Sequence, residues 1–161
     1  MVPVPVYDMR RLDLVVTESS IFRRLPLLCD VFCVSPITGA GSARSGCIMN
    51  DGGAVRAAST KCHDTDYPEV DESGIARLCA LGVETFGRWS TDAITVVKSL
   101  ATERCASLPH RVQRGTEQRL LRRWWGVLGM ATQRMIARSI YENRSADLPT
   151  EICEPNPFFA D

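Results

Sequence analysis

The segment LCALGVETFGRW, residues 78–89, is the part of the chain around which the rest is organised. Its apolar part, Leu78 to Val83, has the length and composition of a short buried strand. Glu84 follows at the end of this strand, and Phe86 to Trp89 then form a tight turn. An ionised carboxylate is costly to bury unless it is paired, hydrogen-bonded or bound to a metal. Two interpretations stay open: Glu84 is a catalytic acid, or it pairs with Arg88 and holds the turn.

The composition is that of one globular domain. The chain has 161 residues, of which 45% are apolar and 24% are charged, and this is enough to build a core. The net charge is zero, yet residues 98–138 contain nine basic and two acidic residues, a net charge of +7, so the remainder carries −7. This polarity is typical of a chain that combines an acidic site with a basic surface for phosphate.

Cysteine usage and hydropathy narrow the class of protein. The seven cysteines are an odd number without a C-x-x-C pair, so we expect free thiols in a reducing intracellular compartment. The first residues do not have the pattern of a signal peptide, and no apolar run has membrane-spanning length. We therefore expect no membrane partner. We also expect no small-molecule cofactor.

Two more strands are predicted ahead of the central segment. Residues 11–17 are aliphatic and β-branched around Asp13, and residues 25–35 form an apolar strand with Asp30 in its middle. A lone acid inside an apolar strand is costly, so a shared metal or a basic partner is implied. For Asp13, a position at a solvent-exposed strand edge is the other interpretation.

Three helices are expected around the sheet, each starting where a capping residue precedes an apolar pattern. They span Gly52–Thr60, Ser90–Ser107 and Thr116–Tyr141. The expected caps are Asp51, then Ser90 or Thr91, then Thr116. Residues 37–53 are expected as a loop and residues 69–74 as an acidic connector. The predicted class is α/β, a small mixed sheet flanked by helices: residues 1–110 form the domain, 111–144 a basic amphipathic helix packed on it, and 145–161 a tail.

The order of these motifs resembles a known family. The motifs are DLVV from Asp13, DVFCVSP from Asp30, Lys61 followed by Tyr67-Pro-Glu, and LGVETFGRW from Leu81. Together they resemble the C-terminal region of non-LTR retrotransposon reverse transcriptase proteins, which is similar to the restriction-endonuclease-like PD-(D/E)XK nucleases. The resemblance covers roughly residues 11–140 and is most specific in the last motif. It implies a truncated nuclease core, with the N-terminal helix of that fold and the polymerase encoded upstream.

The resemblance also implies a function: a DNA-nicking endonuclease, a hydrolase that uses Mg²⁺ or Mn²⁺ and acts in the nucleus. The implied metal ligands are Asp13, Asp30 and Glu84. Lys61 and Tyr67 match the lysine and tyrosine of the family, with Lys61 two residues early. The family usually has a lysine four residues before the tyrosine and often a basic residue just before it. His63 and Asp66 occupy those positions here. His63 is therefore a candidate base, and we expect weak or absent activity.

Two alternatives come from other classes of protein. The first is a nucleic-acid-binding remnant without catalysis, in which basic side chains hold phosphates. Its candidate residues are Arg88, Arg111, Arg114, Arg119, Arg122 and Arg123. The second is a zinc module that uses cysteine and histidine ligands. Its candidate ligands are Cys29, Cys33, Cys62, His63 and Cys79.

Overall fold

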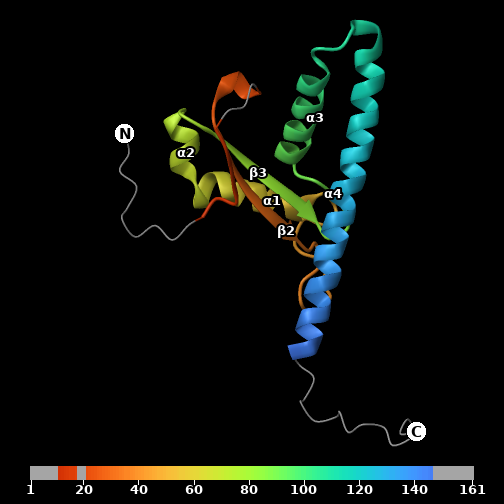
Figure 1. Cartoon of the computed structure of the whole chain (residues 1–161). Helices are drawn as coiled ribbons and strands as arrows, with labels where there is room; N and C mark the ends of the chain where they lie inside the picture. Colours follow the sequence, from red (N-terminus) through yellow and green to blue (C-terminus); the bar gives the residue numbers. More distant parts are fainter. Residues whose placement is uncertain (1–10, 18–20, 147–161) are drawn as a thin grey trace, which may run out of the picture.

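The computed structural model describes residues 11–17 and 21–146, and its centre is a three-stranded mixed sheet (Figure 1). The strands are β1 (Leu14–Val16), β2 (Leu27–Val34) and β3 (Arg77–Glu84), in the spatial order β1-β2-β3. β1 pairs with β2 in antiparallel orientation, whereas β2 and β3 are parallel. The predicted α/β class with a small mixed sheet is confirmed.

A parallel pair needs a crossover, and three consecutive helical segments form it here. They are α1 (Gly53–Lys61), the π-helical turn η2 (Cys62–Asp66) and α2 (Pro68–Ser73). A short 3-10 turn, η1 (Phe22–Arg24), precedes β2. The expectation of a connector over residues 69–74 is wrong, because Pro68 starts a helix. The first N–H groups of a helix have no partner within it, so proline is well tolerated there.

Helices cover both faces of the sheet. Side chains alternate along a strand, and even-numbered residues of β2 and β3 face α1 and η2, whereas odd-numbered ones face α3 (Thr91–Cys105). The buried cluster on the first face contains Cys62, Tyr67, Leu78 and Ala80. The cluster on the second face contains Ile21, Leu27, Cys29, Cys79 and Val96. The sheet is therefore the middle layer of three.

The outer edge of β3 is closed by the chain that leads into α3. The Ser90 hydroxyl accepts a hydrogen bond from the backbone N–H of Gly82 (3.1 Å) and donates to the carbonyl of Ala80 (2.6 Å). The Asp92 carboxylate accepts from the N–H of Ala80 (3.0 Å). Ser90 also caps α3 by accepting from Ala93, which confirms the expected cap. These bonds satisfy a strand edge that would otherwise be open to pairing with another chain.

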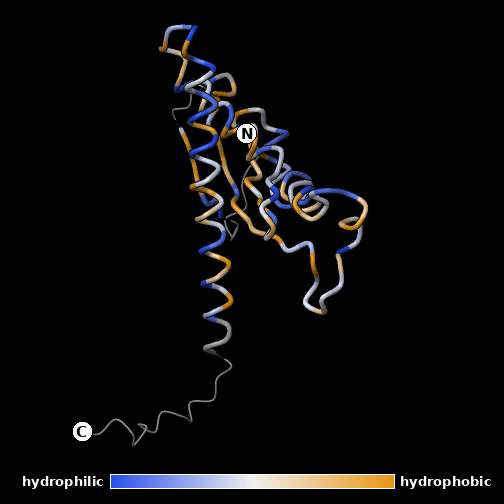
Figure 2. Tube along the Cα trace, turned by 90° about the vertical axis from the view of Figure 1, so that its right-hand side faces the viewer, coloured by the Kyte–Doolittle hydropathy of each residue, from blue (hydrophilic) through white to orange (hydrophobic). Residues whose placement is uncertain are grey.

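The last helix, α4 (His110–Ala146), is longer than predicted. It begins directly after Pro109, whose carbonyl accepts from Val112 and Gln113, so Thr116 lies inside the helix and does not cap it. Its first half packs against α3, Gln133 in its second half contacts the turn after β3, and its C-terminal end extends beyond the sheet (Figures 1 and 2). In the part of the chain that the structure describes, no helix combines the length and apolar character needed to cross a membrane. Most of the expected tail, residues 147–161, lies outside the described residues.

Candidate functional site

Asp13 and Asp30, the two acids of the predicted strands, lie together where β1 meets β2. Asp13 directly precedes β1, and its backbone N–H donates to the carbonyl of Cys29 (3.1 Å), which places it beside Asp30. The Asp13 carboxylate accepts from the N–H of Val31 (2.8 Å). The side chain thus takes the place of a backbone acceptor where the ladder ends. Asp13 is exposed, and its interpretation as a strand-edge residue is confirmed.

Asp30 faces η2, where its carboxylate accepts a hydrogen bond from the thiol of Cys62 (3.7 Å). Burial, followed by repulsion from Asp13, raises the pKa of Asp30, although the Cys62 hydrogen bond and the Lys61 charge oppose this shift. Burial and the charge of Asp30 also raise the pKa of Cys62 to about 12. Cys62 therefore stays a neutral thiol at physiological pH. Two carboxylates that repel each other form a place where a cation would be stabilised.

Glu84 lies on the same face of the sheet as Asp30 but far along it. In the parallel register, Asp30 is opposite Ala80 and Glu84 is opposite Val34. Four residues of strand separate the two acids, which is about 13 Å. The prediction that Asp30 and Glu84 face each other at one end of their strands is therefore wrong. The parallel register, which no local sequence pattern determines, sets this distance.

The carboxylate of Glu84 is fully buried and caps α1. One oxygen accepts from the backbone N–H groups of Ala54 (3.1 Å) and Val55 (3.2 Å), and the other accepts from Arg88 (3.4 Å). The residue at the helix N-cap is a glycine without a side chain to do this. A negative charge at a helix N-terminus satisfies orphan donors and complements the helix dipole. The alternative that Glu84 pairs with Arg88 is confirmed.

Asp51 was the expected cap of α1, and this expectation is wrong. Its carboxylate forms an ion pair with Arg88 instead (2.7 Å). Arg88 therefore bridges Asp51 and the buried Glu84, and its guanidinium is committed to the fold. Arg88 is consequently a poor candidate for holding a phosphate, although it was among the basic residues expected to do so.

Lys61 and Tyr67, the other two residues matched to the family, have structural partners. Lys61 forms an ion pair with Asp66 (3.2 Å). The hydroxyl of Tyr67 donates to the backbone carbonyl of Arg11 (2.9 Å), and its ring is buried in the cluster below the sheet. The charge of Lys61 acts on Asp30 only as a minor influence on its pKa.

A three-acid metal site is not assembled. Within residues 11–17 and 21–146, no group of three or more His, Cys, Asp or Glu side chains is placed to hold a metal ion. Mg²⁺ commonly uses one or two carboxylates together with substrate phosphates. Asp13 and Asp30 fit that smaller donor set, because they repel each other and lie at an exposed junction. Glu84 does not fit it, because its oxygens are already bonded and it lies elsewhere on the sheet.

The five candidate zinc ligands are not brought together either. Cys29 and Cys79 are opposite each other on the face toward α3, whereas Cys62 lies on the face toward α1. The hydrogen bond between Cys29 and Cys79 and their burial raise the pKa of Cys79, which disfavours the thiolate that binds zinc. The sheet itself separates these thiols.

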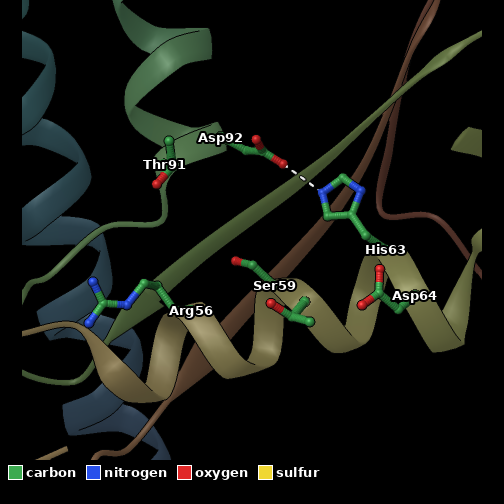
Figure 3. A pocket seen from close by; sticks show the side chains of 7 residues that line it. Arg56, Ser59, His63, Asp64, Thr91 and Asp92 are labelled. Carbon is green, nitrogen blue, oxygen red and sulfur yellow. Dashed lines mark hydrogen bonds and ion pairs between the residues drawn. The ribbon is translucent and has the colours of Figure 1, made fainter. Parts of the chain in front are cut away.

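His63 lies at the edge of a cavity of about 350 Å³ between α1 and the start of α3 (Figure 3). The cavity is lined by Arg56, Ser59, Thr60, His63, Asp64, Thr91 and Asp92. One ring nitrogen of His63 bonds Asp71 and the other bonds Asp92 (2.9 Å). Since both partners are carboxylates, the ring donates from both nitrogens as an imidazolium. No ring nitrogen is left to accept a proton, which argues against His63 as a general base in this state.

The pKa of His63 predicts how the stability of the folded state depends on pH. Burial alone would lower this pKa, but the hydrogen bonds and charges of Asp71 and Asp92 outweigh burial and raise it above the ordinary value of 6.5. The stabilisation that protonated His63 gives the folded state is therefore fully present below pH 6.5. It is lost as pH rises through the higher folded-state pKa of His63. We expect the melting temperature to fall over that interval. His63→Gln should remove this part of the pH dependence, whereas His110→Gln, a change at the exposed start of α4, should keep it. Equal pH profiles for wild type and His63→Gln would contradict the ion-pair link.

Sequence reasoning missed two members of this site, Asp71 and Asp92. Asp71 lies in the stretch predicted as a connector, and Asp92 lies in the first turn of the helix predicted from Ser90. Their common partner, His63, comes from a third element, η2, and only the tertiary fold brings the three side chains together. A local signal did exist for Asp92, because an acid in the first turn of a helix is common, but it did not indicate a histidine partner.

The arginines of α4 form a separate basic surface. All five that the sequence singled out on this helix are exposed: Arg111, Arg114, Arg119, Arg122 and Arg123. Within the described residues, none of them makes an ion pair. The shielded side chains Leu121, Trp124 and Leu128 lie on the side of the helix opposite Arg119, Arg122 and Arg123, whereas Arg114, two turns before Leu121, is on the side of Leu121. No protein-family model, curated protein or solved structure matches this chain.

Proposed function

We propose that this chain is a nucleic-acid-binding domain derived from the endonuclease-like region of a non-LTR retrotransposon reverse transcriptase protein. In this proposal α4 holds the phosphates and the ancestral acid site no longer cuts. The observation that carries the binding part is the exposed arginine face of α4. As part of a mobile-element protein, the chain would act on DNA in the nucleus.

The spacing of the arginines favours one continuous phosphate-binding face. Arg119, Arg122 and Arg123 are separated by three and four residues, so they share a side of the helix, and Arg111 lies about two turns earlier on that side. α4 carries eight arginines against two glutamates. Guanidinium groups match phosphate oxygens in geometry and keep their charge at any physiological pH. A straight basic helix of this length can follow a nucleic-acid backbone over several phosphates.

The order of the motifs supports the proposed origin. The resemblance placed Asp13, Asp30 and Glu84 on three strands of one sheet, and each of the three lies in or beside a strand.

The loss of cutting is supported by the partners of the catalytic candidates. Glu84 caps a helix, Lys61 pairs with Asp66, and both nitrogens of His63 are occupied.

A second candidate function is metal-dependent DNA nicking by a reduced site. The observation that favours it is the Asp13–Asp30 pair, in which repulsion contributes to the raised pKa of Asp30. Asp13 and Asp30 would hold Mg²⁺ or Mn²⁺, and the metal would supply charge stabilisation at the phosphate. The residues of this chain would then contribute the two carboxylates and, from Lys61, a nearby positive charge.

The binding proposal is tested with an arginine variant of α4. Changing Arg119, Arg122 and Arg123 to glutamine should lower the affinity for duplex DNA by about tenfold or more at moderate salt. Each lost phosphate contact reduces the slope of log K against log salt by about 0.9, so three contacts reduce it by about 2.7. Fluorescence anisotropy over a salt series measures both quantities.

The control variant removes the same charge elsewhere. Arg44, Arg56 and Arg77 are exposed and lie off α4, so their combined change to glutamine should leave the salt slope nearly unchanged. Equal losses in the two triple variants would contradict a binding face on α4.

A nicking assay on supercoiled DNA with Mg²⁺ or Mn²⁺ separates the two candidate functions. We expect no nicking by the wild type, and nicking that disappears in Asp30→Asn would establish the second candidate instead.

A further inference from the structure

The turn after β3 holds an aromatic ring in the solvent. Phe86 is 66% exposed although it follows a strand whose last residue is fully buried. A single exposed apolar side chain on a mobile loop is common and needs no explanation. The turn that carries Phe86 is different, because the residues on both sides of Phe86 form backbone hydrogen bonds with the ends of β2 and β3.

The backbone of this turn is closed by three hydrogen bonds. The N–H of Gly87 donates to the carbonyl of Glu84 (2.8 Å), and the N–H of Glu84 donates to the carbonyl of Arg88 (2.7 Å). The N–H of Thr85 donates to Val34 at the end of β2 (3.0 Å). Gly87 has a φ of 88°, a conformation that favours glycine. The ion pair between the buried Glu84 and the half-exposed Arg88 adds a further contact, so Phe86 is carried by a turn that several bonds hold in place.

The same turn lies against α4. The side chain of Gln133 donates to the carbonyl of Thr85 (3.4 Å). The rings of Trp89 and Trp125 pack with their centroids 5.3 Å apart. Arg122, which is exposed, precedes Trp125 by three residues and is its neighbour on the helix surface. The turn that carries the exposed Phe86 therefore contacts α4 close to Arg122, at the C-terminal end of the arginine face.

We propose that Phe86 is a stacking platform for an unpaired nucleobase, so that this chain prefers single-stranded nucleic acid. This inference rests on the proposed function, because the arginines of α4 hold the backbone of the strand whose base stacks on Phe86. Aromatic rings beside a basic surface are the usual means by which proteins bind single strands without reading their sequence. In a duplex, both faces of each base are covered by neighbouring bases, so a fixed ring on a protein surface gains little contact there. Arg88 does not compete for the strand, because it is held by Glu84 and Asp51.

The test compares a labelled oligothymidylate with a duplex of the same length, using the full chain. Wild type should bind the single strand more tightly. Phe86→Ala should lower single-strand affinity by about tenfold and leave duplex affinity and the melting temperature nearly unchanged. Phe86→Trp should retain single-strand binding, and the added tryptophan should be quenched by oligothymidylate beyond the quenching seen in wild type, because a stacked base quenches the ring it covers.

The matched control is Ile75→Ala. Ile75 is exposed to a similar degree, 69%, and lies just before the opposite end of β3, so its change should affect neither affinity. Equal single-strand affinity for wild type and Phe86→Ala would overturn the stacking platform, as would equal losses on single strand and duplex. Wild type that binds duplex through α4 but prefers no single strand would overturn this inference and leave the proposed function intact. Wild type that binds neither nucleic acid would overturn both.

Discussion

Glu84→Ala is expected to lower the free energy of unfolding by about 3–5 kcal/mol, because it leaves two buried backbone N–H groups without an acceptor and opens a cavity. The N–H groups of Ala54 and Val55 would lose their acceptor at the start of α1, and Arg88 would lose one of its two carboxylates. The cavity left by the side chain adds to this cost. Small domains have a total stability of about 5–15 kcal/mol, so a large share would be lost. Chemical denaturation measures the change.

Two further variants show whether the helix cap is responsible. Glu84→Gln keeps an oxygen that can accept from α1 and removes the charge, so it should be destabilised less than the alanine variant. Glu103→Ala changes an exposed glutamate in α3 and should shift stability by less than about 0.5 kcal/mol. A Glu84→Ala protein as stable as Glu103→Ala would show that Glu84 does not hold α1, and would reopen its interpretation as a catalytic acid.

Gly82→Ala is expected to have the second largest effect, about 2–3 kcal/mol of destabilisation from overpacking. A Cβ atom at Gly82 would lie 2.2 Å from one carbon of the Phe32 ring and 2.8 Å from a methyl of Val55. Phe32 and α1 would have to move away from the sheet, and α1 is the helix that Glu84 caps. Thermal unfolding should therefore show a clearly lower melting temperature for this variant.

The comparison for Gly82 is Gly126→Ala. Gly126 lies in α4, and a Cβ there meets no atom within 4 Å. Because alanine favours a helix over glycine by up to about 1 kcal/mol, this variant should be unchanged or slightly more stable. Combining Gly82→Ala with Phe32→Leu should recover part of the loss, since leucine leaves space where the ring edge lies. If the double variant is no more stable than Gly82→Ala, the clash with Phe32 is not the cause.

Local patterns were enough to identify the main elements. The apolar run at residues 78–83 corresponds to β3, and the aliphatic stretches around Asp13 and Asp30 correspond to β1 and β2, with strand boundaries shifted by one to three residues. The Ser90 cap correctly marked the start of α3. These predictions succeeded because side-chain alternation and helix capping depend on residues that are close in sequence.

Predictions failed where the partner of a residue is distant in sequence. Asp51 looked like the natural cap of α1, but the cap is Glu84, thirty positions further along the chain than Ala54. The region after Pro68 looked like a connector because its acids have no apolar pattern, yet it forms α2. Thr116 looked like the start of the last helix, which instead begins at His110 and continues through Gly115.

The α/β class and the basic character of the last helix could be predicted from the residues alone, because they follow from hydrophobic periodicity and from counting arginines. The cost of burying a charge showed that Glu84 needs a partner but left its role open. Only the tertiary structure decided what Glu84 and His63 do. The parallel register of β2 and β3 places Glu84 about 13 Å from Asp30 and under α1. The tertiary fold places His63 of η2 between the carboxylates of Asp71 in α2 and Asp92 in α3. A carboxylate or an imidazole acts according to the groups that surround it, and those groups come from distant parts of the chain.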